Sequence, residues 1–141
     1  MIQIQEALTD NDIQNTWEAM QLLRPHLQEA GYVELVKNMM TEGYRLAFIQ
    51  VDGKVVSVMG YRHLQFLFNG RHIYIDDLST LEAYRGKGYG SMLLNYVANI
   101  AKEKGYRSVT LDSGTHRHNA HRLYMSNGFV IQGYHFTKQL E

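Results

Sequence analysis

The stretch from about residue 71 to residue 81 constrains the fold most, because its apolar residues change parity. Ile73 and Ile75 occupy odd positions, whereas the next large apolar residue, Leu78, occupies an even one. Successive side chains of a strand point to opposite faces of a sheet. A change of parity therefore indicates either a β-bulge or burial on both faces. A bulge would spread this strand from its next neighbour and open a slot in the sheet.

The segments around this strand predict a mixed, mostly antiparallel sheet. Residues 46–51 and 54–66 flank Asp52-Gly53, a dipeptide typical of two-residue hairpin loops. Asn69-Gly70 marks a second turn, before the strand at 71–81. We also expect a first strand around Ile2 and Ile4, a strand at 108–112 and a last strand at about 129–138.

Apolar residues at helical spacing predict about four helices. The first carries Ile13, Trp17, Met20 and Leu23, and Pro25 should end it. The others cover residues 32–41, 92–104 and 119–127. The order of these elements, βααβββαβαβ, indicates an α+β fold.

Length and composition favour one globular domain over residues 1–141. Hydrophobic residues make up 45% of the chain and charged residues 20%, which is ordinary for a globular protein. The absence of cysteine excludes disulfides, thiolate metal sites and cysteine nucleophiles. Without a signal-peptide pattern or a run of about 18 apolar residues, we expect a cytoplasmic protein with no membrane partner.

Charge is unevenly distributed although the net charge is zero. Residues 1–82 hold 6 Lys and Arg against 11 Asp and Glu, whereas residues 83–141 hold 8 against 3. The difference is either ordinary surface variation or a sign that the second half faces an anionic ligand. RNA-binding motifs and long runs of like charge are absent, so we expect no nucleic-acid partner.

A glycine-rich segment follows the predicted strand at 71–81 and precedes a helix. It reads Arg85-Gly86-Lys87-Gly88-Tyr89-Gly90-Ser91. A helix start presents unpaired N–H groups, and glycines let a pyrophosphate approach the backbone closely. The spacing G-x-G-x-G matches neither the dinucleotide-binding fingerprint nor the P-loop. By itself, the segment is either a phosphate-binding loop or a glycine-rich turn.

Two separated motifs carry a resemblance to a known family. Arg85-x-x-Gly88-x-Gly90 resembles the acyl-CoA signature (Q/R-x-x-G-x-G/A) of the GNAT N-acetyltransferase superfamily. Residues 119–129, NAHRLYMSNGF, are similar to the second half of that signature. The resemblance covers roughly residues 73–136 well, and residues 1–60 match mainly in the order of their elements. It implies a GNAT-like α+β fold, with a bulged strand, and acetyl-CoA as cosubstrate.

The resemblance also implies roles for individual residues. Pantetheine would lie along the bulged strand, whose amide near Leu78 would polarise the thioester carbonyl. Pyrophosphate would meet the backbone of the glycine loop. Asn119 and Tyr124 would flank the thiol, and Tyr124 would protonate the departing thiolate; the alternative is a core tyrosine. The candidate cofactor-binding residues are Leu78, Ser79, Thr80, Arg85, Gly86, Lys87, Gly88, Tyr89, Gly90, Ser91, Asn119 and Tyr124.

Acetyl transfer to an amine also needs a base. A lysine-like amine has a pKa of about 10.4, so its deprotonation at pH 7 costs roughly 4–5 kcal/mol. Asp76 and Asp77 lie at the predicted bulge and can remove that proton directly or through water. They alternate along the strand, so we expect one of them to face the site. Many relatives place a glutamate around this strand, whereas Tyr74 occupies one such position here, which leaves the identity of the base open. The alternative for each aspartate is a solvated strand carboxylate.

The acceptor is indicated by a narrower similarity. Residues 117–124 and 136–138, together with 63–66, are similar to the aminoalkylphosphonate N-acetyltransferase branch, which implies a small primary amine with an anionic group. Without cysteine, direct transfer is favoured over an acyl-enzyme. A protein or peptide amine is the alternative acceptor, a CoA-binding module without turnover is the alternative function, and a homodimer stays open. His118 and His121 could share a metal, but local hydrogen bonds are commoner, so we predict none.

Overall fold

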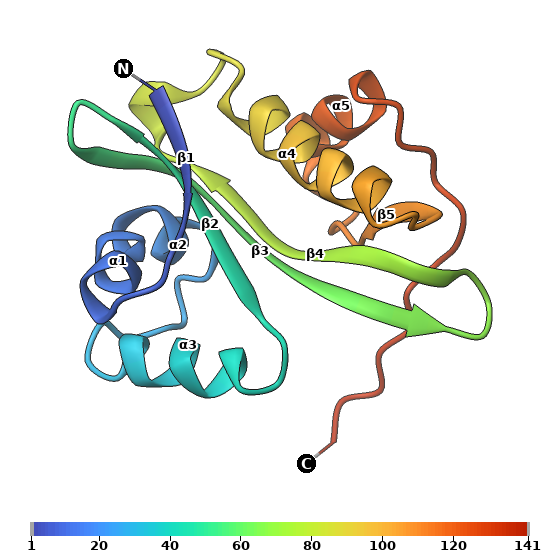
Figure 1. Cartoon of the computed structure of the whole chain (residues 1–141), viewed down its shortest axis with the longest axis horizontal. Coiled ribbons are helices and arrows are strands. Elements are labelled where there is room, and N and C mark those ends of the chain that lie inside the picture. Colours follow the sequence, from blue (N-terminus) through green and yellow to red (C-terminus); the bar gives the residue numbers. More distant parts are fainter. Residues whose placement is uncertain (1, 141) are drawn as a thin grey trace. The chain divides into compact units, whose positions relative to one another are not determined.

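The computed structural model describes residues 2–140, which form two compact units. One unit runs up to Leu111 and the other from Asp112 onward, and each is described by itself. The first unit is built on a five-stranded sheet (Figure 1) with the strand order β1-β2-β3-β4-β5. The second unit contains one helix. A single domain over residues 1–141 stays a prediction.

Four of the five strands pair antiparallel, as the sequence predicts. The strands are β1 (Ile2–Glu6), β2 (Arg45–Val51), β3 (Lys54–Phe66), β4 (Gly70–Thr80) and β5 (Ser108–Leu111), the last parallel to β4. Asp52 and Gly53 join β2 to β3 with φ angles of 49° and 83°. Two consecutive positive φ angles are those of a type I′ turn, which confirms the predicted hairpin.

Helices lie on both faces of the sheet. In the first unit, α1 (Asp10–Asn15), α2 (Trp17–Leu23) and α3 (Tyr32–Met40) cover one face, and α4 (Tyr89–Glu103) covers the other (Figure 1). A short 3₁₀ helix, η1 (Glu82–Tyr84), precedes α4, and α5 (His118–Ser126) belongs to the second unit. Among residues 2–140, no helix combines the length and the apolar character that crossing a membrane requires.

The first predicted helix is in fact two helices, because Thr16 interrupts it. The Thr16 hydroxyl donates to the carbonyl of Ile13 at 2.6 Å and accepts from the Tyr32 hydroxyl at 2.8 Å. A threonine that bonds back to the preceding turn competes with the helical backbone. The described residues therefore contain five α-helices where about four were expected.

The predicted last strand is wrong. Residues 129–140 form no helix or strand in the structure. Their alternating apolar residues give them a preference for extended backbone, but that preference makes a strand only where a ladder partner and a packed face are present. No ladder forms along these residues.

The predicted bulge is confirmed in β4. Gly60 pairs with Asp77 and Tyr61 pairs with Ile75, so Asp76 is an extra residue without a partner on β3. Side chains of paired residues share a face, and the extra residue therefore brings Ile75 and Leu78 to the same side of the sheet. Pairing with β5 ends at Ile75, immediately before the bulge. The parity change in the sequence thus marks a bulge rather than burial on both faces.

Replacement of Thr16 by valine should destabilise the protein. Thr16 is fully buried, and the variant leaves the buried Tyr32 hydroxyl without its acceptor, which costs about 1–3 kcal/mol. The free energy of unfolding in urea measures this loss. Thr41→Val is the matched control, because the exposed Thr41 also bonds to a helix carbonyl and should change stability by less than about 0.5 kcal/mol. Equal effects of the two substitutions would contradict the assignment.

Candidate active site

The edge of β4 beyond the bulge carries backbone groups that do not face β3. The Leu81 N–H donates to the Val56 carbonyl at 2.9 Å. Backbone groups along an antiparallel strand alternate between its two neighbours, so Ser79 also faces β3 while Leu78 and Thr80 face the opposite edge. A hydrogen bond of Arg85 supports this orientation: its Nε donates to the Thr80 carbonyl at 3.1 Å. The pairing of β4 with β5 does not extend to this edge.

The glycine loop leads from this edge into α4. Gly86 and Gly88 have φ angles of 77° and 88°, a conformation that other residues rarely adopt. Gly88 is the N-cap of α4, where no side chain caps the helix and the first turn contains no acidic residue. Residues 85–88 are exposed. The side chain of Tyr89 is buried, so this residue offers a ligand only its backbone.

Asp77 is fully engaged by protein groups. Its Oδ1 accepts from Nε of Arg24 at 3.0 Å, and its Oδ2 accepts from the Tyr44 hydroxyl at 2.7 Å. Burial, together with the charge of Asp77, raises the pKa of Tyr44 well above its usual value. Tyr44 therefore stays protonated and donates permanently to this carboxylate.

Asp76 is only partly engaged. Its Oδ2 accepts from Nε of Arg62 at 2.9 Å, whereas its Oδ1 is buried without a hydrogen-bond partner among the described residues. Burial raises the pKa of Asp76 above its usual value, although Arg62 acts in the opposite direction. Asp76 thus has the properties of a base: an unused acceptor oxygen and an increased affinity for a proton.

The two carboxylates belong to one charged cluster, which consists of Arg24, Tyr44, Arg62, Asp76 and Asp77. The Arg62 guanidinium lies 5.4 Å from the centroid of the Tyr44 ring, and Tyr44 in turn holds Asp77. We expected only one aspartate to face the site because side chains alternate along a strand. The bulge removes that alternation at Asp76 and Asp77.

Sequence reasoning missed the partners of the two aspartates. Arg24 directly follows α2, Tyr44 directly precedes β2 and Arg62 lies in β3, and no spacing in the sequence links them. Gly60 is a further missed residue. A Cβ at this position would collide with the end of the Tyr44 ring and lie 2.6 Å from Oδ2 of Asp77.

Gly90 and Ser91 lie in the first turn of α4, and the other two predicted residues lie in the second unit. Asn119 is in the first turn of α5 and Tyr124 is near its end. The Tyr124 ring lies 6.0 Å from that of Phe129. Nε2 of His121 donates to the Gly114 carbonyl at 2.8 Å, a local hydrogen bond of the kind expected for this histidine. The roles of Asn119 and Tyr124 toward the cosubstrate stay predictions.

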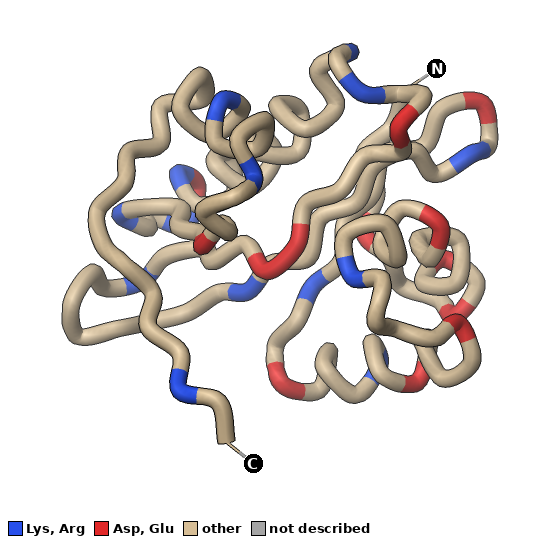
Figure 2. Tube along the Cα trace, turned by 180° about the vertical axis from the view of Figure 1, so that it is seen from behind, with Lys and Arg blue, Asp and Glu red and all other residues tan. Residues whose placement is uncertain are grey.

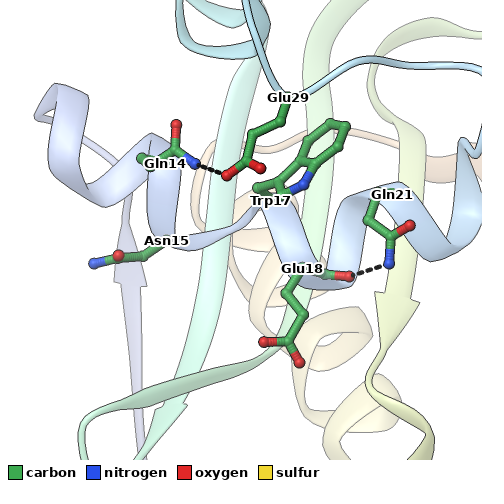
Figure 3. A pocket seen from close by; sticks show the side chains of 6 residues that line it. All are labelled: Gln14, Asn15, Trp17, Glu18, Gln21 and Glu29. Carbon is green, nitrogen blue, oxygen red and sulfur yellow. Dashed lines mark hydrogen bonds between the residues drawn. The ribbon is translucent and has the colours of Figure 1, made fainter.

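A separate pocket is formed by side chains of α1, α2 and the loop that follows α2 (Figure 3). It has a volume of about 410 Å³ and is lined by Gln14, Asn15, Trp17, Glu18, Gln21 and Glu29. The Trp17 ring packs edge-on against Tyr32 at 5.0 Å between centroids. The pocket combines an aromatic side chain with carboxylates and amides.

Comparison with known proteins identifies relatives of the chain. An uncharacterized N-acetyltransferase, YhdJ of Bacillus subtilis, is 31% identical over 140 residues, which cover 98% of this chain and 99% of that protein. The aminoalkylphosphonate N-acetyltransferase of Salmonella typhimurium is 34% identical over 99 residues, or 69% of this chain and 62% of that enzyme.

Solved structures share the fold. A transcriptional regulator from Bacillus halodurans has a TM-score of 0.87 at 22% identity, over 99% of this chain and 100% of that one. AAC(6')-Iy in complex with a CoA-linked bisubstrate analogue has a TM-score of 0.85 at 12% identity, over 100% and 99%. The model of the acetyltransferase (GNAT) family matches residues 11–129. The chain therefore belongs to the acetyltransferase (GNAT) family and is an acyl-CoA N-acetyltransferase whose cosubstrate is acetyl-CoA.

Proposed function

We propose that the protein moves the acetyl group of acetyl-CoA directly to a primary amine, and that the acceptor is a small molecule such as an aminoalkylphosphonate. The observation that carries this proposal is the bulge at Asp76. The pairing with β5 ends immediately before the bulge, and the bulge carries a carboxylate with an unused oxygen in the same stretch of β4. An amine acetyltransferase needs both features together: an edge for the thioester and a base for the amine.

Backbone groups would hold most of the cosubstrate. Leu78 and Thr80 would bond to pantetheine along the edge of β4 beyond the bulge, and the Leu78 amide would polarise the thioester carbonyl. Ser79 would support this edge, because its hydroxyl donates to the Ala19 carbonyl of α2 at 2.7 Å. The pyrophosphate would bind at the start of α4, where Gly86 and Gly88 keep the backbone accessible and the uncapped helix favours an anion.

Asp76 is the base that the geometry favours. A carboxylate oxygen buried without a partner has lost its solvation, which costs about 1–3 kcal/mol or more. Uptake of a proton relieves this cost, so the amine proton would move to Asp76. Asp77 acts as a positioning residue, since Arg24 and Tyr44 occupy both of its oxygens.

Tyr124 is the proposed acid for the departing thiolate, and Asn119 the proposed neighbour of the thiol. Proton transfer by such a group contributes about 10²–10⁴-fold to the rate of a reaction. The chain contains no cysteine, so the acetyl group would pass straight to the amine nitrogen while both substrates are bound.

A peptide amine is the second candidate acceptor, and one observation favours it. Between residues 10 and 42 the chain holds six Asp and Glu against two Lys and Arg, and Figure 2 shows acidic positions on α1 to α3 and the loops between them. Together with the pocket at Trp17, this surface would attract a basic peptide. The similarity to an aminoalkylphosphonate enzyme supports the small acceptor instead.

Replacement of Gly88 by alanine should weaken acetyl-CoA binding. Gly88 has a φ of 88°, and alanine there shifts the loop backbone that would hold the pyrophosphate. Calorimetry should show an increase in Kd of about tenfold, or 1.4 kcal/mol. Gly105→Ala is the control: Gly105 has a φ of 72° beyond the other end of α4, so both variants lose about 1–2 kcal/mol of stability but only the first loses affinity. Equal affinities would refute the assignment of the loop.

Asp76→Asn should lower kcat/KM by about 10²–10⁴-fold while acetyl-CoA binding is kept. Asp76 must be ionised to accept a proton, so activity falls as the pH drops through its raised pKa. This acid limb should disappear in Asp76→Asn and persist in Asp77→Asn, because the carboxylate of Asp77 is already occupied. An acid limb retained in Asp76→Asn, or lost in Asp77→Asn, would move the base elsewhere.

A panel of amines tests the acceptor class. Release of the CoA thiol should be at least about tenfold more efficient, in kcat/KM, with small primary amines than with lysine-rich peptides, a difference of about 1.4 kcal/mol. A preference for peptides would favour the second candidate. Acetyl-CoA binding without turnover of any amine would indicate a CoA-binding module and would refute the proposed function.

A further inference from the structure

We propose that Arg24 and Arg62 recognise an anionic group on the acceptor, so that the enzyme selects amines with a phosphonate, phosphate or carboxylate a few bonds from the nitrogen. The inference rests on the proposed transfer to a small amine at Asp76, and it assigns the specificity of that site to two residues. Neither arginine belongs to the motifs of the glycine loop or of α5.

Both guanidinium groups keep unused donors. A guanidinium has five N–H groups. Arg62 donates from Nε to Asp76, and Arg24 donates from Nε to Asp77 and from Nη2 to the Asp76 carbonyl at 2.9 Å. No acceptor within residues 2–140 takes their other N–H groups. The side chains are 41% and 25% exposed for Arg24 and Arg62, so these donors can meet a ligand.

The two guanidinium groups are held close to each other. Both bond to Asp76, Arg62 at the carboxylate and Arg24 at the main-chain carbonyl. The Arg62 guanidinium also packs on the Tyr44 ring. The Tyr44 hydroxyl in turn donates to the Asp77 carboxylate, which also accepts from Arg24. A planar guanidinium that is held in place is well suited to donate two hydrogen bonds to one oxyanion.

An anionic group on the acceptor would also compensate the charge that the cluster gains during the reaction. At rest, two carboxylates balance two guanidinium groups. When the ammonium nitrogen gives its proton to Asp76, the cluster gains one positive charge and Arg62 loses its counter-ion. The neutral nitrogen then bonds to the acetyl carbon and the carbon–sulfur bond breaks. The thiolate takes up a proton from its acid, and the second proton of the nitrogen, lost as the amide forms, restores that acid, so that the net proton released stays on Asp76 until it passes to solvent. An anionic group beside Arg62 restores the balance and favours the protonated form of Asp76.

The same argument disfavours other amines. A neutral alkylamine lacks the compensating charge. A diamine brings a second positive charge toward Arg24 and Arg62, and like charges at close range cost free energy. The preferred acceptor therefore carries its two opposite charges close together.

Substrate preference and direct binding together test this inference. The wild type should use aminomethylphosphonate with a KM about 10–100-fold lower than that of ethylamine or ethylenediamine, the difference that one or two charge-assisted hydrogen bonds produce. Arg62→Gln and Arg24→Gln should lower activity with every amine, because both residues also hold the aspartates, and should abolish the preference by raising the KM of the phosphonate more than that of the other amines. Arg71→Gln, an exposed position of β4 outside the cluster, should leave it unchanged.

A second measurement does not depend on turnover. Methylphosphonate, which has no amine, should bind to the acetyl-CoA-loaded wild type in calorimetry, and Arg62→Gln should lose this binding while Arg62→Lys keeps part of it. An equal loss of activity toward all amines in the arginine variants would show a merely structural role and refute the inference. If the enzyme acetylates neutral amines but does not bind methylphosphonate, the role of the two arginines is refuted and the proposed function stands. If it binds methylphosphonate but acetylates no amine, only the proposed function is refuted.

Discussion

The extra residue in β4 is the constraint on which the site depends. Because Asp76 has no partner on β3, the strand changes parity and Leu78 shares a face with Ile73 and Ile75. The same local distortion coincides with the end of pairing to β5, which leaves backbone groups of Leu78 and Thr80 directed away from β3. It also places two consecutive carboxylates in one cluster. A single insertion thus lies beside both the edge that we propose for the thioester and the carboxylate that we propose as the base.

Such a cluster is stable only because each charge has a partner. Two partly buried carboxylates would repel each other and lose solvation, and Arg24 and Arg62 offset both effects. Tyr44 can reach Asp77 because the residue opposite Asp77 is glycine: any side chain at Gly60 would displace the Tyr44 ring. Gly60 is therefore required by packing rather than by backbone conformation, since its φ is not positive.

The order of the strands, the hairpin and the bulge could be predicted because each leaves a local signal, such as Asp52-Gly53 or the parity change before Leu78. The break at Thr16 could not, because the hydroxyl that bonds back to Ile13 also contacts the Tyr32 hydroxyl, and Tyr32 lies sixteen residues away in the sequence. The predicted last strand is wrong, since alternating apolar residues indicate a preference for extended backbone but do not show whether a neighbouring strand is there to pair with it. The aspartates were found as candidates, but their partners Arg24 and Arg62 become neighbours only through the fold.

The role proposed for Asp76 has a consequence for stability. Its pKa is higher in the folded chain than the ordinary value of 3.8, so the folded state binds this proton more tightly than the unfolded state does. The resulting stabilisation is present below the ordinary pKa and is lost as the pH rises through the raised one. Near neutral pH the fold therefore holds an ionised, half-satisfied carboxylate at a cost in stability. In the reaction that we propose, transfer of the amine proton to Asp76 would relieve that cost.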